Sequence, residues 1–330
     1  MKDLLTIENL VVEFNTPAGV VQAVNGISYS VAEGEIVAIV GESGSGKSVS
    51  ARAVLGLVPD PPGKIVSGSI WFDSVDLLGL DDQSIRDLRG KDISMVFQEP
   101  MTSLNPVLSI GRQLTEAMQL HLGLSPSVVD SRAVELLKMV GISDPEDRLT
   151  QYPHQLSGGM RQRVMIAMAL SCKPKLILAD EPTTALDVTI QAQVLSLMQK
   201  LCLDMGVALV IITHNLGIVA RYAKHVNVMY AGRIVESGPA STLYNNPSHP
   251  YTVGLLNSVP RLDQERGKLI EPIPGSPPDL AALGSGCAFA PRCRFATDLC
   301  HNESPVLESV GDNHQSACWE IAAVHRETAA

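Results

Sequence analysis

Two glycine-containing segments of this chain have the composition of a phosphate-binding site. The first, Gly41-Glu42-Ser43-Gly44-Ser45-Gly46-Lys47-Ser48, matches G-x-x-x-x-G-K-[ST], and the second is Leu156-Ser157-Gly158-Gly159-Met160. A glycine-rich turn that leads into a helix presents unpaired backbone N–H groups to an anion, together with the positive end of the helix dipole. Only the first segment adds a lysine and a hydroxyl that suits Mg²⁺, so it alone predicts a complete nucleotide site.

The first segment also has the sequence context that its motif requires. It follows residues 35–40, an apolar run with the β-branched character of a buried parallel strand, and helix-forming sequence comes after it. Lys47 is expected to reach the β- and γ-phosphates, and Ser48 to place its hydroxyl on Mg²⁺. The residues expected to contact the nucleotide here are Gly41, Ser43, Gly44, Gly46, Lys47 and Ser48.

Ionisable side chains follow two further apolar runs. Asp180 and Glu181 come directly after residues 176–179, and His214 follows residues 208–213. Asp180 is expected to hold magnesium through water, which leaves Glu181 to orient or deprotonate an attacking water. A neutral imidazole at position 214 can hydrogen-bond a γ-phosphate oxygen or that water. Together with the first segment, these residues predict phosphoryl-transfer chemistry.

The elements that must position these residues alternate along the chain. Residues 1–95 are expected to form strands around the first phosphate-binding segment, and residues 160–240 to alternate between helix and strand, a pattern typical of a mostly parallel sheet. Between them, residues from about 98 to 152 favour helices. One of these is expected to start at Ser125-Pro126, with a capping residue and a proline in its first turn, and to stop at Gly141.

In order and spacing, six elements of this chain resemble those of the ATP-binding subunit of an ABC transporter. They are Gly41–Ser48, Gln98, Leu156–Met160, Asp180-Glu181, Ala185-Leu186-Asp187 and His214. The resemblance implies an α/β P-loop NTPase fold with a mostly parallel core sheet, an antiparallel β subdomain and a helical subdomain at about 98–165. It also implies that Gln98 links magnesium to a membrane partner and that His214 is the switch histidine.

The same resemblance gives the second phosphate-binding segment a function. In this family two cassettes dimerise head to tail, so that Ser157, Gly158 and Gly159 would bind the ATP held by the opposite subunit, and Asp187 would be the D-loop aspartate. Most members carry Gln where this chain has Met160. The serine and both glycines that face phosphate are present, so the implied role is unaffected.

Phe14 falls where the family places the aromatic residue that stacks on adenine. Stacking requires only a flat π-face, which Phe offers as well as Tyr. The alternation of residues around it equally suits a plain strand residue, so both interpretations stay open.

Composition agrees with an enzyme that uses ATP and has no membrane span of its own. The formal net charge of −10 opposes binding to nucleic acid or to an anionic membrane surface. No apolar run approaches the roughly 20 residues that span a bilayer, and the first residues do not resemble a signal peptide. Attachment to a membrane is therefore expected to come through partner chains.

The C-terminal part of the chain differs in composition. A proline-rich stretch at 272–278 precedes Cys287, Cys293, Cys300 and Cys318, whose spacing is C-x5-C-x6-C-x17-C. In a reducing compartment four such cysteines favour a metal or cluster site over disulfides, and a tetrathiolate site suits Zn²⁺ or an iron–sulfur cluster alike. Cys172 and Cys202 lie in apolar helical contexts and are expected to be small buried residues.

The tail also resembles that of the oligopeptide and dipeptide branch of ABC importers. The residues that carry this resemblance are His249-Pro250-Tyr251-Thr252, Pro272-Ile273-Pro274-Gly275, Gly286-Cys287-Ala288-Phe289 and Arg292-Cys293. It implies an ATPase domain at 1–250, a C-terminal extension at 251–330, and a [4Fe–4S] cluster on the four cysteines, with Zn²⁺ as the alternative.

The resemblance implies the partners and location of the protein as well. They are two membrane-spanning permease subunits, a second and paralogous ATPase subunit, and, indirectly, an extracytoplasmic peptide-binding protein, with this chain peripheral on the cytoplasmic face of the inner membrane. Nickel or another small solute remains an alternative cargo. Two other classes stay open: a soluble ABC protein of DNA repair or translation, which usually carries tandem cassettes or coiled-coil insertions, and a regulatory iron–sulfur protein that uses ATP as a switch.

Overall fold

The computed structural model describes residues 2–17, 19–184, 186–258 and 272–328. The chain divides into two compact units. One comprises Met1–Asp3, Val31–Ile36 and Gly79–Ile212, and the other comprises Leu4–Ser30, Val37–Leu78 and Thr213–Ala330. We call the first the helical unit and the second the P-loop unit, because the segment Gly41–Ser48 lies in the second.

The P-loop unit contains an antiparallel sheet whose strands lie in the order β2-β1-β4-β5. The strands are β1 (Asp3–Thr16), β2 (Gly19–Ala32), β4 (Gly63–Phe72) and β5 (Val75–Asp76). In β1, Leu10 and Val12 are buried while Val11 and Glu13, which alternate with them, are only half-buried, as expected for a strand with one more solvated face. This sheet confirms the antiparallel part of the predicted fold.

A second set of paired strands in the same unit begins with β3 (Ile36–Val40), all five residues of which are buried. Strand β3 pairs in parallel with β9 (His225–Tyr230), and β9 pairs antiparallel with β10 (Arg233–Pro239). The helices of the unit are α1 (Lys47–Val54), η1 (Leu77–Gly79), α9 (Leu216–Val219), α10 (Ala240–Asn245) and α11 (Pro250–Asn257). Burial on both faces explains why β3 appears in the sequence as a continuous apolar run.

The C-terminal residues are joined to this set of strands rather than hanging from it. Strand β12 (His314–Ser316) pairs antiparallel with β10 and with β11 (Glu308–Gly311). The short helices η3 (Ala290–Arg292) and α12 (Asp298–Asn302) precede them, and α13 (Ile321–Thr328) follows. The carboxylate of Glu236 in β10 is completely buried and accepts from the backbone N–H groups of Ser248 and His249, at 2.6 and 3.0 Å. His314 Nε2 lies 2.8 Å from the same carboxylate.

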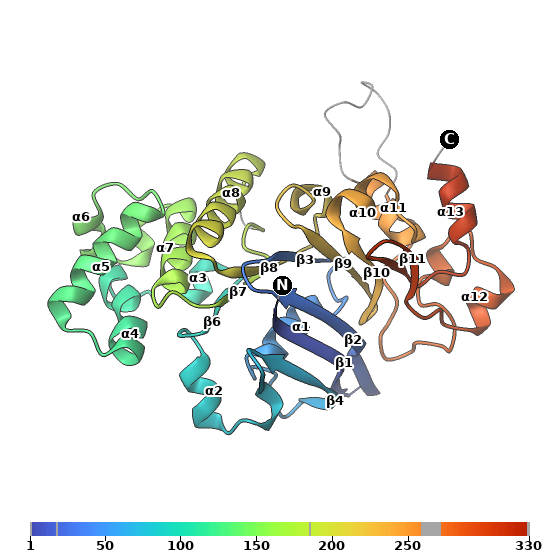
Figure 1. The fold of residues 1–330 in the computed structure, drawn as a ribbon, viewed down its shortest axis with the longest axis horizontal. Helices are drawn as coiled ribbons and strands as arrows, with labels where there is room; N and C mark the ends of the chain where they lie inside the picture. The colour runs from blue at the N-terminus through green and yellow to red at the C-terminus, as the bar shows by residue number, and fades with distance from the viewer. Residues whose placement is uncertain (1, 18, 185, 259–271, 329–330) are drawn as a thin grey trace. The chain divides into compact units, whose positions relative to one another are not determined.

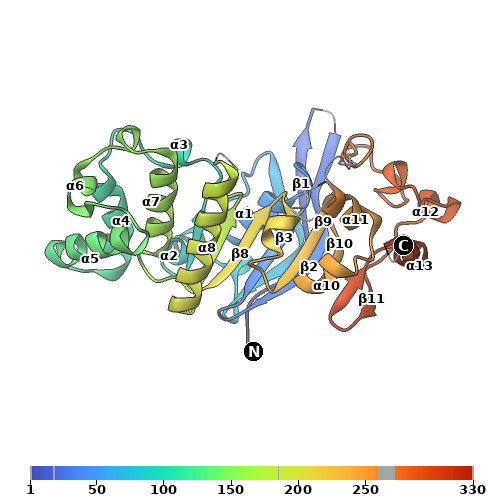
Figure 2. The same ribbon diagram turned by 90° about the horizontal axis from the view of Figure 1, so that it is seen from above.

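The helical unit is built on three parallel strands. Strand β7 (Leu176–Asp180) pairs with β6 (Ile93–Val96) on one side and with β8 (Ala208–Thr213) on the other. Helices α4 to α7 gather together in both views (Figures 1 and 2). The helices of this unit are α2 (Asp82–Leu88), α3 (Pro100–Ser103), α4 (Ile110–Leu122), α5 (Pro126–Met139), α6 (Pro145–Thr150), η2 (Pro153–Gln155), α7 (Gly158–Leu170) and α8 (Val188–Met205).

The predicted helix at 126 is confirmed in its bounds, and only the expected side-chain cap at Ser125 is corrected. Helix α5 has Pro126 in its first turn, and Gly141, at φ 75°, follows its end. Ser125 occupies the N-cap position, but among the described residues its side chain makes no capping hydrogen bond; Ser125 Oγ instead lies 3.4 Å from Ser127 Oγ. No helix among the described residues is both long and apolar enough to cross a membrane.

Candidate nucleotide-binding site

The first phosphate-binding segment connects the end of β3 to the start of α1. Gly46 is the N-cap of α1, at φ 97°, and a glycine has no side chain with which to cap the helix. The first backbone N–H groups of α1 therefore suit an external anion. Ser43 and Gly44 are exposed at the outer side of the loop, and Ser48 is half-buried in the first turn of α1.

Two glycines of the segment lie where no other residue fits. A Cβ atom at Gly41 would lie 2.1 Å from Met229 O, and one at Gly46 would lie 2.1 Å from Ala23 O. Both neighbours are backbone atoms, which cannot rotate away. Close packing against β2 and β9 thus sets the path of the loop, in addition to the need for close approach to a phosphate.

Lys47 points back across the loop that precedes it. Its Nζ donates to Gly41 O at 2.7 Å and to Glu42 O at 2.8 Å, and only 4% of the residue is exposed. The ammonium is held at the concave side of the loop, the position from which it can meet the β- and γ-phosphates of a nucleotide.

Phe14 and His214 lie in the same unit as this loop. Phe14 is half-buried opposite Gly63 of β4, and a Cβ at Gly63 would lie 2.7 Å from Phe14 Cε1, so the ring covers the glycine. His214 follows β8 and is exposed. Gly41 N donates to Thr213 O at 3.3 Å, which brings the start of the loop next to the residue before His214.

In the helical unit, Asp180 and Glu181 follow one another at the end of β7. Asp180 is 2% exposed and Glu181 9%. Glu181 N donates to Ile212 O at 2.8 Å, and Glu181 adopts φ 45°, a left-handed conformation that is uncommon for a residue other than glycine. Such conformations often occur at functional sites, where the surrounding structure holds them.

Two side chains orient the Glu181 carboxylate. Thr184 Oγ1 donates to Glu181 Oε2 at 2.6 Å, and Gln98 Nε2 approaches the same oxygen at 3.4 Å. The structure thus brings Gln98 and Glu181 together. The sequence did not single out Thr184, although its place three residues after Glu181 in a tight turn is a signal that could have found it.

The second phosphate-binding segment forms the N-terminus of α7. Ser157 is the N-cap, and its Oγ accepts from Met160 N at 3.3 Å. Ser157 and Gly158 are exposed. Added Cβ atoms at Gly158 and Gly159 would meet their nearest neighbours at 3.9 and 3.6 Å, which is ordinary contact. This helix end is therefore partly exposed and makes only ordinary contacts with its own unit.

Asp187 lies close to that helix end. It is the exposed N-cap of α8 and accepts from Ile190 N at 3.0 Å. The side chains nearest to a Cβ atom added at Gly158 or Gly159 are those of Leu186 and Ile190, respectively. The start of α8 thus lies beside the second segment. Ala185, the first residue of the predicted D-loop motif, is outside the described residues.

The four C-terminal cysteines share one small cavity. Cys287, Cys293, Cys300 and Cys318 line it together with apolar residues that include Pro250, Phe295, Pro305 and Trp319. Burial raises the pKa of Cys287 and of Cys293, and raises that of Cys318 to about 12. Within the described residues, no group of three or more His, Cys, Asp or Glu side chains is arranged to hold a metal ion. Cys172 and Cys202 are buried elsewhere, as expected.

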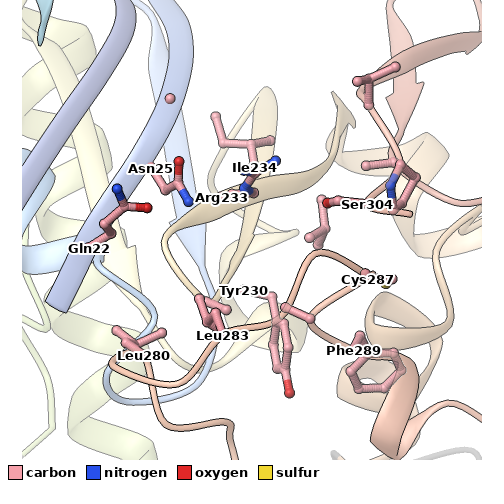
Figure 3. A pocket seen from close by; sticks show the side chains of 18 of the residues that line it. Gln22, Asn25, Tyr230, Arg233, Ile234, Leu280, Leu283, Cys287, Phe289 and Ser304 are labelled. Carbon is pink, nitrogen blue, oxygen red and sulfur yellow. The ribbon is translucent and has the colours of Figure 1, made fainter. Parts of the chain in front are cut away.

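A larger cavity of about 950 Å³ lies between the β1–β2 hairpin, β10 and the C-terminal tail. Figure 3 shows that Gln22 and Asn25 line this cavity from the N-terminal strands, whereas Leu280, Leu283 and Ser304 line it from the C-terminal tail. Of the predicted site residues that the structure describes, Cys287 alone lines it. It is therefore distinct from the nucleotide site.

Comparisons with known proteins agree with this geometry. The sequence profile of the ABC transporter family matches residues 24–184, and that of the oligopeptide/dipeptide transporter C-terminal region matches residues 235–300. The chain is 49% identical to the dipeptide transport ATP-binding protein DppD of Bacillus subtilis, over 97% of this chain and 95% of that one. It is likewise 49% identical to DppD of Escherichia coli, over 96% of each chain.

Solved structures support the same fold. An ATP-binding cassette, MJ0796, in a dimeric post-hydrolysis state with ADP and Pi, superposes with a TM-score of 0.64 at 28% identity, covering 72% of this chain and 98% of that one. The structure of cbiO1 from Clostridium perfringens, part of an ABC transporter complex, gives a TM-score of 0.63 at 28% identity, covering 74% and 91%.

Proposed function

Because the chain belongs to the ABC transporter family, with the C-terminal region of its oligopeptide and dipeptide branch, we propose that it binds and hydrolyses ATP to power the import of short peptides. The observation that carries this proposal is the pairing of a complete P-loop with a branch-specific C-terminal region in one chain. ATP and Mg²⁺ are the cofactors of the reaction. The composition of the nucleotide site supports hydrolysis, since Glu181 is buried and oriented by Thr184.

The proposed assembly places ATP between two cassettes. The exposed N-terminus of α7, with Ser157, Gly158 and Gly159, would complete the nucleotide site of a second ATPase subunit, and Asp187 would act beside it. The dimeric state of the MJ0796 cassette supports this arrangement by similarity. We propose further that the second ATPase subunit is a paralogue of this chain and not a second copy of it.

The remaining partners follow from peptide import. Membrane-spanning permease subunits must carry the peptide, because no described helix of this chain can span a bilayer. We place the chain on the cytoplasmic face of the inner membrane, bound to two permease subunits, with an extracytoplasmic peptide-binding protein acting on the far side.

The four cysteines are proposed to bind a [4Fe–4S] cluster. Four thiolates around one cavity with apolar walls form a suitable donor set. A mononuclear zinc site needs all four sulfurs about 2.3 Å from one ion. A [4Fe–4S] cluster uses the same four thiolates, each on a separate iron. Because no group of three or more such side chains among the described residues is arranged to hold a metal ion, the proposal rests on the four cysteines sharing one cavity. When bound, the cluster would cross-link the segments of the tail.

Chemical analysis tests the cofactor directly. Anaerobic purification should give about four iron and four sulfide per chain with brown absorbance. Cys293→Ser should remove the iron, while the matched variant Cys202→Ala should keep it. A result of one zinc per chain without iron would show a zinc site in place of the cluster. If all four thiols are freely alkylated in the native protein, the proposal of a bound cofactor is wrong.

Reconstitution tests the transport function. The chain would be purified with its membrane complex through an affinity tag and placed in liposomes, where ATP-driven uptake of labelled di- to pentapeptides and of Ni²⁺ is compared. Peptide uptake that Lys47→Ala abolishes is the expected result. Uptake of Ni²⁺ but not of peptides would show that the transported substrate is a metal ion. Purification of the chain without any membrane subunit would contradict a transport function.

A further inference from the structure

Glu42, the second residue of the P-loop, is held by two residues from the C-terminal third of the chain. Glu42 N donates to Tyr251 Oη at 2.7 Å. The Glu42 carboxylate accepts two hydrogen bonds from Arg292, from Nη1 at 2.7 Å and from Nη2 at 3.0 Å. The Arg292 side chain is 5% exposed and that of Glu42 is 27% exposed. This is a bidentate, largely desolvated ion pair between the tail and the phosphate loop.

Arg292 is itself fixed from several sides. Its Nε donates to Pro274 O at 2.8 Å, and Nη1 also donates to Tyr230 Oη at 3.2 Å. The guanidinium lies 5.8 Å from the ring centres of both Tyr230 and Phe289. These two rings pack edge to face at 5.2 Å, and both are labelled in Figure 3. Because its rotamer is locked in this way, Arg292 can hold Glu42 in one place.

The pair is poorly explained by stability alone. A buried ion pair gains little over apolar side chains of similar volume, because both charges must be desolvated. Its position gives it a second consequence. A carboxylate on the loop that wraps the phosphates repels a polyanionic ligand unless a cation neutralises it, and Arg292 supplies that cation together with a fixed geometry.

We propose that Arg292 is a positioning residue of the nucleotide site: it neutralises Glu42 and fixes the P-loop for ATP, so that the C-terminal tail forms part of that site. The inference rests on the ATP-binding function proposed above. Arg292 lies between Cys287 and Cys293 in sequence, so one short segment carries both the cysteine site and the support of the loop.

The test measures dissociation constants of Mg-ATP and Mg-ADP on the purified full chain. Arg292→Met should weaken Mg-ATP binding about tenfold, which corresponds to a loss of about 1.4 kcal/mol of binding free energy. Adding Glu42→Gln to that variant should restore most of the affinity, because no unneutralised carboxylate then remains on the phosphate-binding loop. Arg292→Lys keeps the charge but loses the bidentate geometry of the guanidinium, so its Mg-ATP affinity should lie between those of wild type and Arg292→Met.

Arg294→Met provides the matched control, because Arg294 is half-exposed in the same segment and pairs with Glu327 of the tail itself. It should leave the affinity unchanged. Iron content and the unfolding midpoint are measured for every variant. A lowered midpoint with unchanged Mg-ATP affinity in Arg292→Met would show a merely structural role and overturn the proposal. So would additive losses in the double variant. Failure of wild type to bind ATP would instead contradict the proposed function.

Discussion

The two phosphate-binding segments of this chain are built in opposite ways. The P-loop is enclosed: Gly41 and Gly46 touch backbone of β9 and β2, Lys47 is buried, and Arg292 holds Glu42 from the tail. The N-terminus of α7 is open, with Ser157 and Gly158 exposed and space for a Cβ at both of its glycines.

The difference agrees with the proposal that the P-loop serves this chain's own nucleotide and the N-terminus of α7 that of a second subunit. An anion site that must bind ligand in an isolated subunit gains from fixed donors, since their ordering is already complete before binding. A site that is completed by a second subunit can leave its donors facing solvent. The exposed α7 end therefore agrees with use in trans, and the following experiments test that division, from the largest expected effect to the smallest.

The largest effect on ATP turnover is expected when the Glu181 carboxylate is lost and both phosphate-binding segments are left unchanged. Glu181→Gln keeps the shape of the side chain and the contact with Thr184, but it loses the carboxylate that takes the proton of the attacking water. We expect ATP binding to persist and turnover of the assembled complex to fall roughly 10²-fold or more. ATPase rates check this, and turnover above about a tenth of wild type would contradict the role of Glu181.

Blocking the open segment should separate hydrolysis from binding. Ser157→Arg places a large cation at the N-terminus of α7, where it fills the anion site. Hydrolysis of the nucleotide held by the partner subunit should stop, while this chain's own ATP affinity stays close to wild type. Binding to the isolated variant, measured beside the ATPase rate of the complex, decides the matter. Loss of binding at its own P-loop would show that the segment acts in cis.

Adding one methyl group to a glycine of each segment compares the two directly. Gly41→Ala forces a Cβ to within 2.1 Å of Met229 O, so the loop must move. The Mg-ATP affinity of the isolated chain should then fall by about 5- to 150-fold, the equivalent of the roughly 1–3 kcal/mol that overpacking changes cost. Gly159→Ala meets only Ile190 at 3.6 Å. It should leave affinity unchanged in the isolated chain, and equal losses in both variants would remove the distinction.

Local features of these sites were predictable from the sequence, and their supports were not. The P-loop, Asp180-Glu181 and the helix start at Pro126 are each specified within a few neighbouring residues, and the structure places them as expected. Thr184 could have been found from its short separation from Glu181. Arg292 could not, because it meets Glu42 across 250 positions. A contact of that kind depends on the path of the whole tail, and no sequence pattern in this chain predicts that path.

The support of the enclosed segment should also respond to pH, whereas the open segment should not. His249 caps α11 by accepting from Tyr251 N, and Tyr251 in turn binds Glu42 N. Burial lowers the pKa of His249 from 6.5 to about 4, against an opposing effect of nearby Glu236. Below pH 6.5 the unfolded chain therefore binds a proton at His249 that the folded chain does not. The free energy of unfolding falls as pH falls towards 4.

His249→Asn, which keeps a side-chain cap without the titration, isolates this contribution. Between pH 6.5 and pH 4 the wild type should lose about 1.4 kcal/mol per pH unit more than the variant, while above pH 7 the two curves should run parallel. Urea unfolding at a series of pH values measures the difference. His154→Asn, an exposed histidine of the helical unit, is the control and should follow the wild type. Parallel wild-type and His249→Asn curves down to pH 4 would show that His249 does not couple pH to the structure beneath the P-loop.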